Sequence, residues 1–395
     1  MNDNGGNEEK IRKPSIIENL LFGCTIREVP RLIPGVLFAI TLVVLFIWLT
    51  NFLNAALGFS GLISYILVVI IAGIVVRNIF SIPTFFGSGI DFCLKKLLRL
   101  GIILMGIRLS IFNILEIGVW GIPIVVVCVV SGLVLTIYVS RLMKLPDKLA
   151  TLIAVGTSIC GASAILAIAP GINAKDEEVT YAVANITVFG IIAMIVYPFL
   201  SHWLFNGDTI LSGLFTGTSI HETAQVAASS LIYDQTFLIT SEPTVADVAM
   251  VTKLVRNVLM AVVIPLMIFV YARRTGDVGS SSEPIYKKTI KLFPLFILGF
   301  MVMAIIRSIG DAGIHNNNLA IGLWNNNQWA GVISGIKEWS GYIMATAMAG
   351  VGLGTSFKSM KRLGIKPFYA GFFTAALVGV VAIIMVFALG RFVLI

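Results

Sequence analysis

The stretch Gly156-Thr-Ser-Ile-Cys-Gly-Ala-Ser163 interrupts a long apolar run, and the same tetrapeptide returns in Gly217-Thr-Ser-Ile-His-Glu-Thr-Ala-Gln225. Hydroxyl, imidazole and carboxylate groups are costly in such apolar surroundings. At membrane depth, irregular backbone is tolerated only where it is buried in protein or lines a water-filled cavity. Paired Gly-interrupted segments of this kind point to the binding site of a transporter.

The composition of the whole chain indicates the class of protein. Of its 395 residues, 57% are hydrophobic and only 12% are charged, and the mean hydropathy is +0.96. A soluble protein carries about 25% charged residues, so we expect an all-α, polytopic membrane helical bundle. The net charge of +8 comes from Lys and Arg in predicted loops, where they set topology. We therefore expect no nucleic-acid partner.

No motif for a cofactor is found in the sequence. The cysteines are dispersed and lack the Cys/His spacing of a metal site, so we interpret them as small buried side chains; they are Cys24, Cys93, Cys128 and Cys160. Only Cys160 lies within a polar break. The absence of a nucleotide motif argues against an ATP-driven pump, and we expect no cofactor and no metal.

Apolar runs of about twenty residues predict about eleven transmembrane segments. They are placed at 31–54, 62–80, 93–114, 119–143, 148–170, 178–204, 208–232, 246–272, 289–309, 329–357 and 367–390. The seventh run is rich in Gly, Ser and Thr, and whether it crosses the membrane fully stays open. Residues 31–395 are expected to form one transmembrane domain, and 1–30 a cytoplasmic segment with either an interfacial helix or a partly disordered tail.

Loop charges predict the orientation. Lys and Arg gather before the first run and in alternate loops after it, including 141–148 and 273–291. The positive-inside rule then places the N-terminus in the cytoplasm, the C-terminus outside and the acidic stretch 175–178 outside.

Internal similarity suggests an inverted repeat. Leu104–Phe112 resembles Met348–Phe357, and these two runs are predicted to cross in opposite senses, as inverted repeats require. The two Gly-Thr-Ser-Ile runs, however, are predicted to cross in the same sense. Either the second half is permuted or the seventh run turns back; chance similarity is the alternative.

The first break is suited to holding an anion. A half-helix that starts after it would present free N–H groups and a positive dipole end, to which Thr157, Ser158 and Ser163 would add hydroxyl donors. The alternative is a contact of small residues that lets two helices approach closely.

The second break carries titratable groups. His221 and Glu222 could exchange protons near neutral pH, beside the hydroxyls of Thr218 and Ser219. The alternative is a buried, hydrogen-bonded His-Glu pair with a purely structural role.

The eighth run contains two cations within an apolar helix. Lys253, Arg256 and Asn257 share one helical face, so the cations could neutralise a bound anion or pair with Glu222. Asp247, nearer the outer end, is a further candidate for ion coupling. Interfacial snorkelling is the alternative for the cations.

These strings resemble the putative sulfate exporter family of bacterial inner-membrane proteins. The resemblance extends from about residue 30 onward and rests on Gly156–Ser163, Pro170 to Glu178, Tyr181-Ala182, Phe189-Gly190, Tyr197-Pro198, Gly217–Val226 and Lys253–Arg256. This family is related to cation:proton antiporters and bile-acid transporters. The relation implies panel and core domains, crossing unwound helices, elevator-type motion and often a homodimer.

We therefore expect a secondary active transporter of the bacterial plasma membrane that exports a small anion, a sulfur oxyanion among the candidates, coupled to protons or another ion. One alternative is a monovalent cation:proton antiporter, with Glu222 and Asp247 as ligands and Lys253 as the competing ammonium. Another is an intramembrane hydrolase using a Gly-x-Ser loop. Because His221 is only two residues from Ser219, a productive nucleophile–base pairing is awkward, and we expect no enzyme.

Overall fold

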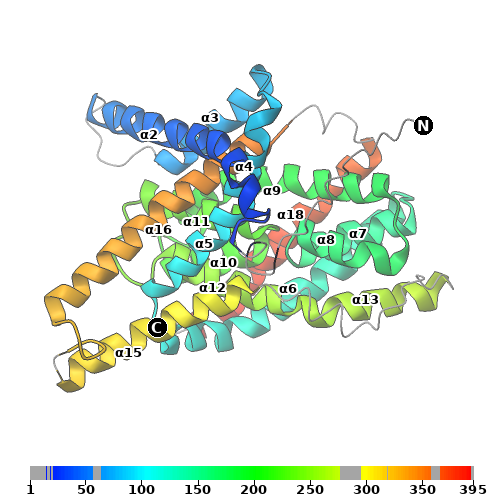
Figure 1. Ribbon diagram of the computed structural model, residues 1–395. Helices are drawn as coiled ribbons and strands as arrows, with labels where there is room; N and C mark the ends of the chain where they lie inside the picture. The colour runs from blue at the N-terminus through cyan, green and yellow to red at the C-terminus, as the bar shows by residue number, and fades with distance from the viewer. Residues whose placement is uncertain are drawn as a thin grey trace, which may run out of the picture.

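The computed structural model describes residues 15, 18, 21–56, 64–275, 295–317, 319–356 and 365–392. Within these ranges the chain is helical, with a single isolated bridge between Ala320 and Trp324. Figure 1 shows long helices inclined across the molecule, with shorter ones between them. The expectation of an all-helical protein is confirmed.

The first half of the chain alternates long helices with short ones. They are α2 (Ile33–Ala56), α3 (Tyr65–Ile79), α4 (Gly87–Phe92), α5 (Leu98–Met105), α6 (Ile111–Leu142), α7 (Asp147–Ser158), α8 (Ala162–Ile168) and α9 (Asp176–Leu204). A 3-10 turn, Gly106–Arg108, links α5 toward α6. The N-terminal segment contains a 3-10 helix, Ile26–Arg31, in which hydrogen bonds donated by Thr25 lower the pKa of Glu28. Much of the rest of the predicted N-terminal helix lies outside the described residues.

The second half contains the remaining labelled helices. They are α10 (Thr209–Ser219), α11 (Thr223–Thr236), α12 (Val245–Val258), α13 (Met260–Thr275), α15 (Phe296–Asn317), α16 (Asn326–Gly354) and α18 (Ile365–Leu389). Each predicted apolar run therefore contains helix. By length and composition, five described helices could cross a membrane, or up to seven if each of two bent pairs is one span. The count of about eleven spans stays a prediction.

Both Gly-Thr-Ser-Ile segments end a helix, as expected. The first break lies between α7 and α8, where Gly161 has φ +72° and ψ −130°. The second lies between α10 and α11, where Ile220 and Glu222 are extended. A φ of this sign is strained for residues other than glycine, so Gly161 permits the first turn.

The first broken segment is a helical hairpin. The Lys148 ammonium donates to the carbonyl of Asn173 at 2.8 Å, and a β-carbon added to Gly156 would stand 2.7 Å from the Ile165 side chain. Both pairs are centred on the turn at Cys160 and Gly161. The chain thus turns back after α7 and returns to the end of the molecule where α7 began.

The second broken segment is also a hairpin, as its contacts with α12 show. α10 runs parallel to α12, because Gly213 packs on Val248 and Gly217 on Thr252. α11 runs antiparallel to α12: Asn257 bonds Thr223, whereas Asp234 accepts from the N–H groups that begin α12. α10 and α11 therefore run in opposite directions.

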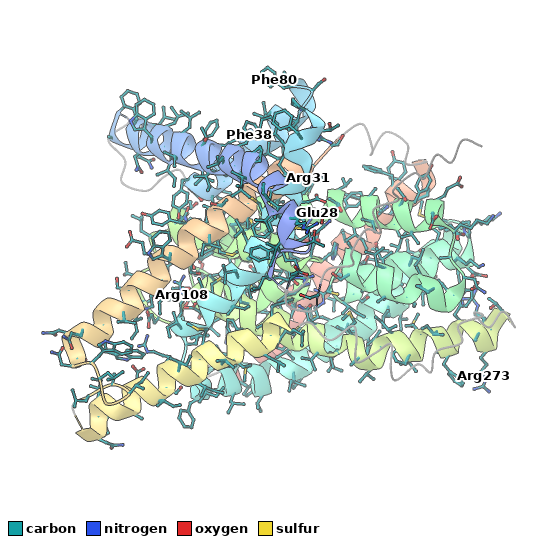
Figure 2. All side chains as sticks on the ribbon, in the orientation of Figure 1. Glu28, Arg31, Phe38, Phe80, Arg108 and Arg273 are labelled. Atoms are coloured by element: carbon teal, nitrogen blue, oxygen red, sulfur yellow. The ribbon has the colours of Figure 1, made fainter. Side chains whose placement is uncertain are left out.

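The two hairpins enter from opposite ends of the molecule. The end of α13 lies beside the start of α7, where Arg274 and Asp147 are 2.6 Å apart, whereas the start of α12 lies beside the end of α11. The α12–α13 pair bends by 41° and connects these two ends. Figure 2 shows Arg273, near the end of α13, far from Arg108, which is paired with α12. We call the two ends the α7 end and the α10 end.

This arrangement corrects two predictions. The two Gly-Thr-Ser-Ile segments run in opposite senses, not in the same sense, and the stretch 175–178 follows Asn173 at the α7 end, beside the basic link 141–148 rather than across the membrane from it. Hydropathy reports that a run is long and apolar enough to cross. It does not report that the chain turns halfway, which the packing between the arms decides.

The helices pack as two groups. The α16 group comprises α2, α3, α4, α5, α15 and α16, and the hairpin group comprises α6 to α13 and α18. α11 packs on α3 and α16, and α6 packs on α15, so these contacts join the groups. In Figure 1 the α16 group occupies the upper and left part of the view, and α7, α8 and α13 the right.

Candidate functional site

The tips of the two hairpins meet inside the hairpin group. A β-carbon added to Gly161 would lie 3.3 Å from the Glu222 β-carbon, so the residue before α8 contacts the residue before α11. The His221 ring contacts the backbone of Thr157 on the other hairpin. The starts of two helices and the ends of two others therefore converge at one place.

Lys253 of α12 binds the two helix ends together. Its side chain is fully buried, and its ammonium donates to the carbonyls of Ile159 at 3.0 Å, Ile220 at 2.8 Å and His221 at 2.5 Å. An ammonium has three N–H groups, so these bonds use all of them.

Arg256 does the same one turn later. It is 1% exposed and donates to the carbonyls of Ser158 at 2.8 Å, Thr218 at 2.7 Å and Ile220 at 3.0 Å, and also to that of Thr157. The two cations thus bind carbonyls from the last turns of both α7 and α10.

These bonds have a clear physical cause. The last four carbonyls of a helix lack intrahelical partners, and the C-terminal end of a helix is negative. Two such ends meet here, away from water. A buried cation at each satisfies the carbonyls and balances the dipoles, which explains why Lys253 and Arg256 lie in an otherwise apolar helix.

Lys253 and Arg256 were expected to neutralise a bound anion or to pair with Glu222, and their hydrogen bonds go to backbone carbonyls. Lys253 has no N–H left for a ligand, and most of the guanidinium of Arg256 is engaged by carbonyls. Snorkelling is equally excluded, because both side chains are buried. Their positive charge still lies beside the meeting tips.

The predicted hydroxyl ligands separate into different environments. Thr218 donates to Leu214 O at 2.7 Å and Ser219 to Phe215 O at 2.6 Å, so both bond within α10. This geometry gives no support to Ser219 as a nucleophile. The Ser158 hydroxyl is buried, has no partner among the described residues and faces Gly132 of α6.

The two remaining hydroxyl candidates lie on the first hairpin. Thr157 is 2% exposed, and its carbonyl is bound by Arg256. Ser163 is exposed in the first turn of α8. Of the predicted ligands on this hairpin, Ser163 is thus the accessible one at a helix N-terminus.

The starts of α8 and α11 form the more open side of the meeting point. Glu222 and Thr223 are partly exposed, whereas His221 is 2% exposed with Nδ1 unpartnered among the described residues. Asn257 donates to the Thr223 hydroxyl at 3.2 Å. Its Oδ1 is buried and likewise has no partner in the described part of the chain.

Asp247 lies apart from this meeting point. It is the third residue of α12, where it accepts from the N–H and hydroxyl of Thr244, both at 3.0 Å, and its Oδ1 lies 3.0 Å from Nε of Arg108. Lys253 follows it by nearly two helical turns, about 9 Å along the axis. The structure therefore does not bring Asp247 together with Glu222.

Two further polar side chains, Asn257 and Gln225, make contacts between helices near the tips. Asn257 shares the face of Lys253 and Arg256, a signal the 3.6-residue period supplies, but its partner Thr223 depends on the hairpin. Gln225 lies against Gly190 of α9 and donates to Thr187 O at 3.3 Å. No local pattern predicts that contact.

Comparison with known proteins shows the family. The family described as Conserved hypothetical protein 698 matches residues 34–371. A UPF0324 membrane protein of Fusobacterium nucleatum is 33% identical over 308 residues, 77% of this chain and 84% of the relative. One from Clostridium tetani is 30% identical over 367 residues, 90% and 97% of the two chains.

A UPF0324 membrane protein of Bacillus cereus is 31% identical over 341 residues, 85% of this chain and 90% of the relative. No solved structure matches. The relatives are named as membrane proteins, in agreement with the apolar helices described above. The chain belongs to the Conserved hypothetical protein 698 family, together with the UPF0324 membrane proteins of diverse bacteria.

Proposed function

We propose that this protein is a secondary active transporter of a small anion, a sulfur oxyanion among the candidates, in the bacterial plasma membrane. The observation that carries the proposal is the meeting of two hairpins that enter from opposite ends, with Gly161 against Glu222. Discontinuous helices near the middle of a membrane are the usual site of substrate and ion binding in transporters.

The charges around the tips support an anionic substrate. The C-terminal ends of α7 and α10 are neutralised by Lys253 and Arg256, whereas the starts of α8 and α11 leave N–H groups on the more open side. Helix N-termini favour anions. In this proposal the anion is held by these N–H groups and the Ser163 hydroxyl, with the buried cations contributing charge at a distance.

Glu222 is proposed as the coupling group. It is the one carboxylate at the tips among the described residues, it is partly exposed, and it follows the buried His221. Binding a proton there would remove a negative charge beside the helix starts and so strengthen anion binding. Asp247 drops out of this role because Arg108 and Thr244 already engage it.

The two groups of helices suggest the moving parts. We propose that the hairpin group moves against the α16 group. In this proposal the hairpin group is the core domain, and the α16 group the panel domain, that the resemblance implies. If neither hairpin crosses the membrane, the predicted topology loses two crossings. Both termini then remain on their predicted sides. The N-terminus is therefore still proposed to be cytoplasmic, and the α7 end, which carries Lys148 and Arg274, to face the cytoplasm.

A monovalent cation:proton antiporter is the second candidate, and one observation favours it. The unpartnered Oδ1 of Asn257 lies near Thr223, one residue after Glu222, and oxygens of this kind are ligands for hard cations. In that case the buried ammonium of Lys253 would balance charge rather than compete for the site, since its N–H groups are engaged.

Reconstitution of the purified protein distinguishes these candidates. Proteoliposomes are loaded with a pH gradient, and uptake of labelled sulfate or sulfite is measured beside proton release on adding sodium or potassium. Anion uptake that depends on the pH gradient supports the proposal; proton release driven by a cation, without anion flux, supports the antiporter.

Two serine variants refine the result. Ser163→Ala is expected to weaken anion uptake, because it removes a hydroxyl from the first turn of α8. Ser219→Ala is the matched control, because its hydroxyl is already bonded within α10. Equal uptake by the two variants would contradict the assigned binding side.

A further inference from the structure

Polar contacts between the two groups of helices gather at the α10 end. Arg108, at the end of the 3-10 turn that packs on α15 and α16, lies 3.0 Å from Asp247 of α12. Lys337 of α16 forms an ion pair with Glu242, in the link before α12. The Ser64 hydroxyl, at the start of α3, donates to the side-chain oxygen of Gln235 at 2.7 Å.

The hairpin-group partners of these contacts belong to one continuous stretch. Gln235 lies in the last turn of α11, Glu242 in the following link and Asp247 in the first turn of α12. Asp234 accepts from Val245 and Ala246 and so fixes the end of α11 to the start of α12. A displacement of the α10–α11 hairpin would therefore strain these three contacts together.

At the α7 end, three polar contacts between described residues join members of the same group. Lys148 bonds Asn173 and Arg274 pairs with Asp147, all within the hairpin group. Asn78 of α3 donates to Thr355, within the α16 group. These bonds need not break when the two groups move relative to each other.

We propose that Arg108–Asp247, Lys337–Glu242 and Ser64–Gln235 form a latch that holds the α10–α11 hairpin against the α16 group and closes the α10 end. The inference rests on the proposed function, because a latch needs alternating states to act on. In the state described here the latch is engaged. Its release is the step that exposes the hairpin tips from the α10 end.

The three contacts differ in strength. Asp247 is 1% exposed, so its pairing with Arg108 is shielded from solvent, whereas the side chains of Lys337 and Glu242 are 27% and 46% exposed. Removing one partner of a buried pair costs far more than removing one of an exposed pair. The Arg108–Asp247 pair thus contributes most to the strength of the latch, and the Lys337–Glu242 pair contributes less.

Cys160 provides a native reporter for the test. It is 6% exposed at the tip of the first hairpin, and Cys24, Cys93 and Cys128 are replaced by Ala. The labelling rate of Cys160 by a membrane-impermeant maleimide is measured from each side of the membrane, in cells and in inverted vesicles. No transport is needed for this measurement.

Breaking the latch is expected to raise labelling from the α10 side only. Lys337→Glu should increase the rate about two- to fivefold, within the range of exposed ion pairs, and Arg108→Gln about tenfold or more. Lys337→Glu combined with Glu242→Lys should restore the original rate. Arg274→Glu is the matched control, because its pair with Asp147 is similarly exposed but lies within one group.

Arg108→Gln leaves Asp247 buried without its cation, so this variant is interpreted only where it elutes as a folded protein. Lys337→Glu and Gln235→Ala keep the test decisive in any case. Unchanged labelling in both of them would overturn the latch, as would an equal increase in Arg274→Glu. Increased labelling without anion flux in any variant would support the latch and reject the proposed substrate.

Discussion

Gly161 packs against Glu222, so closely that a β-carbon on the glycine would stand 3.3 Å from the Glu222 β-carbon. The two residues precede α8 and α11, on hairpins that enter the molecule from opposite ends. Their contact defines the place where the two hairpins meet. Beside it, Lys253 and Arg256 bind the carbonyl ends of α7 and α10, so both hairpins are hydrogen-bonded to α12.

Gly161→Ala is expected to destabilise the protein by about 2 kcal/mol, because a φ of +72° is strained for a side-chain-bearing residue. The added methyl group also presses on Glu222. Thermal unfolding in detergent measures the loss. Gly335→Ala is the control: open space surrounds that position in α16, so alanine there should leave stability unchanged or raise it by up to about 1 kcal/mol. Equal effects at the two glycines would refute the tip contact.

Lys253→Met is expected to cost about 3–5 kcal/mol. Methionine keeps most of the length of the side chain but leaves the buried carbonyls of Ile159 and His221 without a donor, while the carbonyl of Ile220 keeps only Arg256. The protein should melt earlier and aggregate on size exclusion. Lys95→Met provides the comparison, since Lys95 pairs with Asp91 on the exposed surface and should cost less than about 1 kcal/mol. A Lys253→Met protein as stable as Lys95→Met would show that the carbonyls do not need the ammonium.

Glu222→Gln is expected to abolish coupling while leaving the fold intact. Glutamine keeps the shape of the side chain and cannot exchange a proton, so anion uptake should no longer respond to the pH gradient. Proton flux is recorded with an internal dye, beside the melting temperature. Glu338→Gln, in α16, should behave as the unmodified protein. If the Glu222→Gln variant retains pH-driven uptake, a residue other than Glu222 carries the coupling role.

The hairpins predict which side of the membrane each end of α9 faces. In a background without native cysteines, Glu177→Cys should react with impermeant maleimide from the side where Arg274→Cys reacts, and Trp203→Cys from the opposite side. All three new cysteines replace exposed residues. Topology with eleven full crossings requires the reverse assignment for both positions. If the two cysteines are labelled from the reversed sides, both broken segments cross the membrane fully and the hairpins are contradicted.

Much of the secondary structure could be predicted from hydropathy and local pattern. Helices lie within all the predicted runs, and both Gly-Thr-Ser-Ile strings end a helix. Lys253, Arg256 and Asn257 do share a face of α12, as the helical period predicts. What they bind was not predictable, because their partners are backbone carbonyls and a hydroxyl brought close by tertiary packing.

Asp247 is a second residue whose contacts could not all be predicted from the sequence. As a carboxylate in an apolar run it was a reasonable candidate for ion coupling. Asp247 caps α12 through Thr244, which is three residues away in the sequence. It also pairs with Arg108, which is distant in the sequence. Only the packing of the 3-10 turn after α5 on the start of α12 brings that pair together.

Hydropathy is enough to predict a helical membrane protein, and the glycine and hydroxyl residues are enough to predict where its helices break, because these features act locally on the backbone. That each broken segment turns back, and hence that the two run in opposite senses, follows only from the packing of the helices. A run of about twenty apolar residues satisfies a crossing and a hairpin equally well. The choice between them depends on side-chain contacts between arms and on the buried cations of α12, which no local pattern contains.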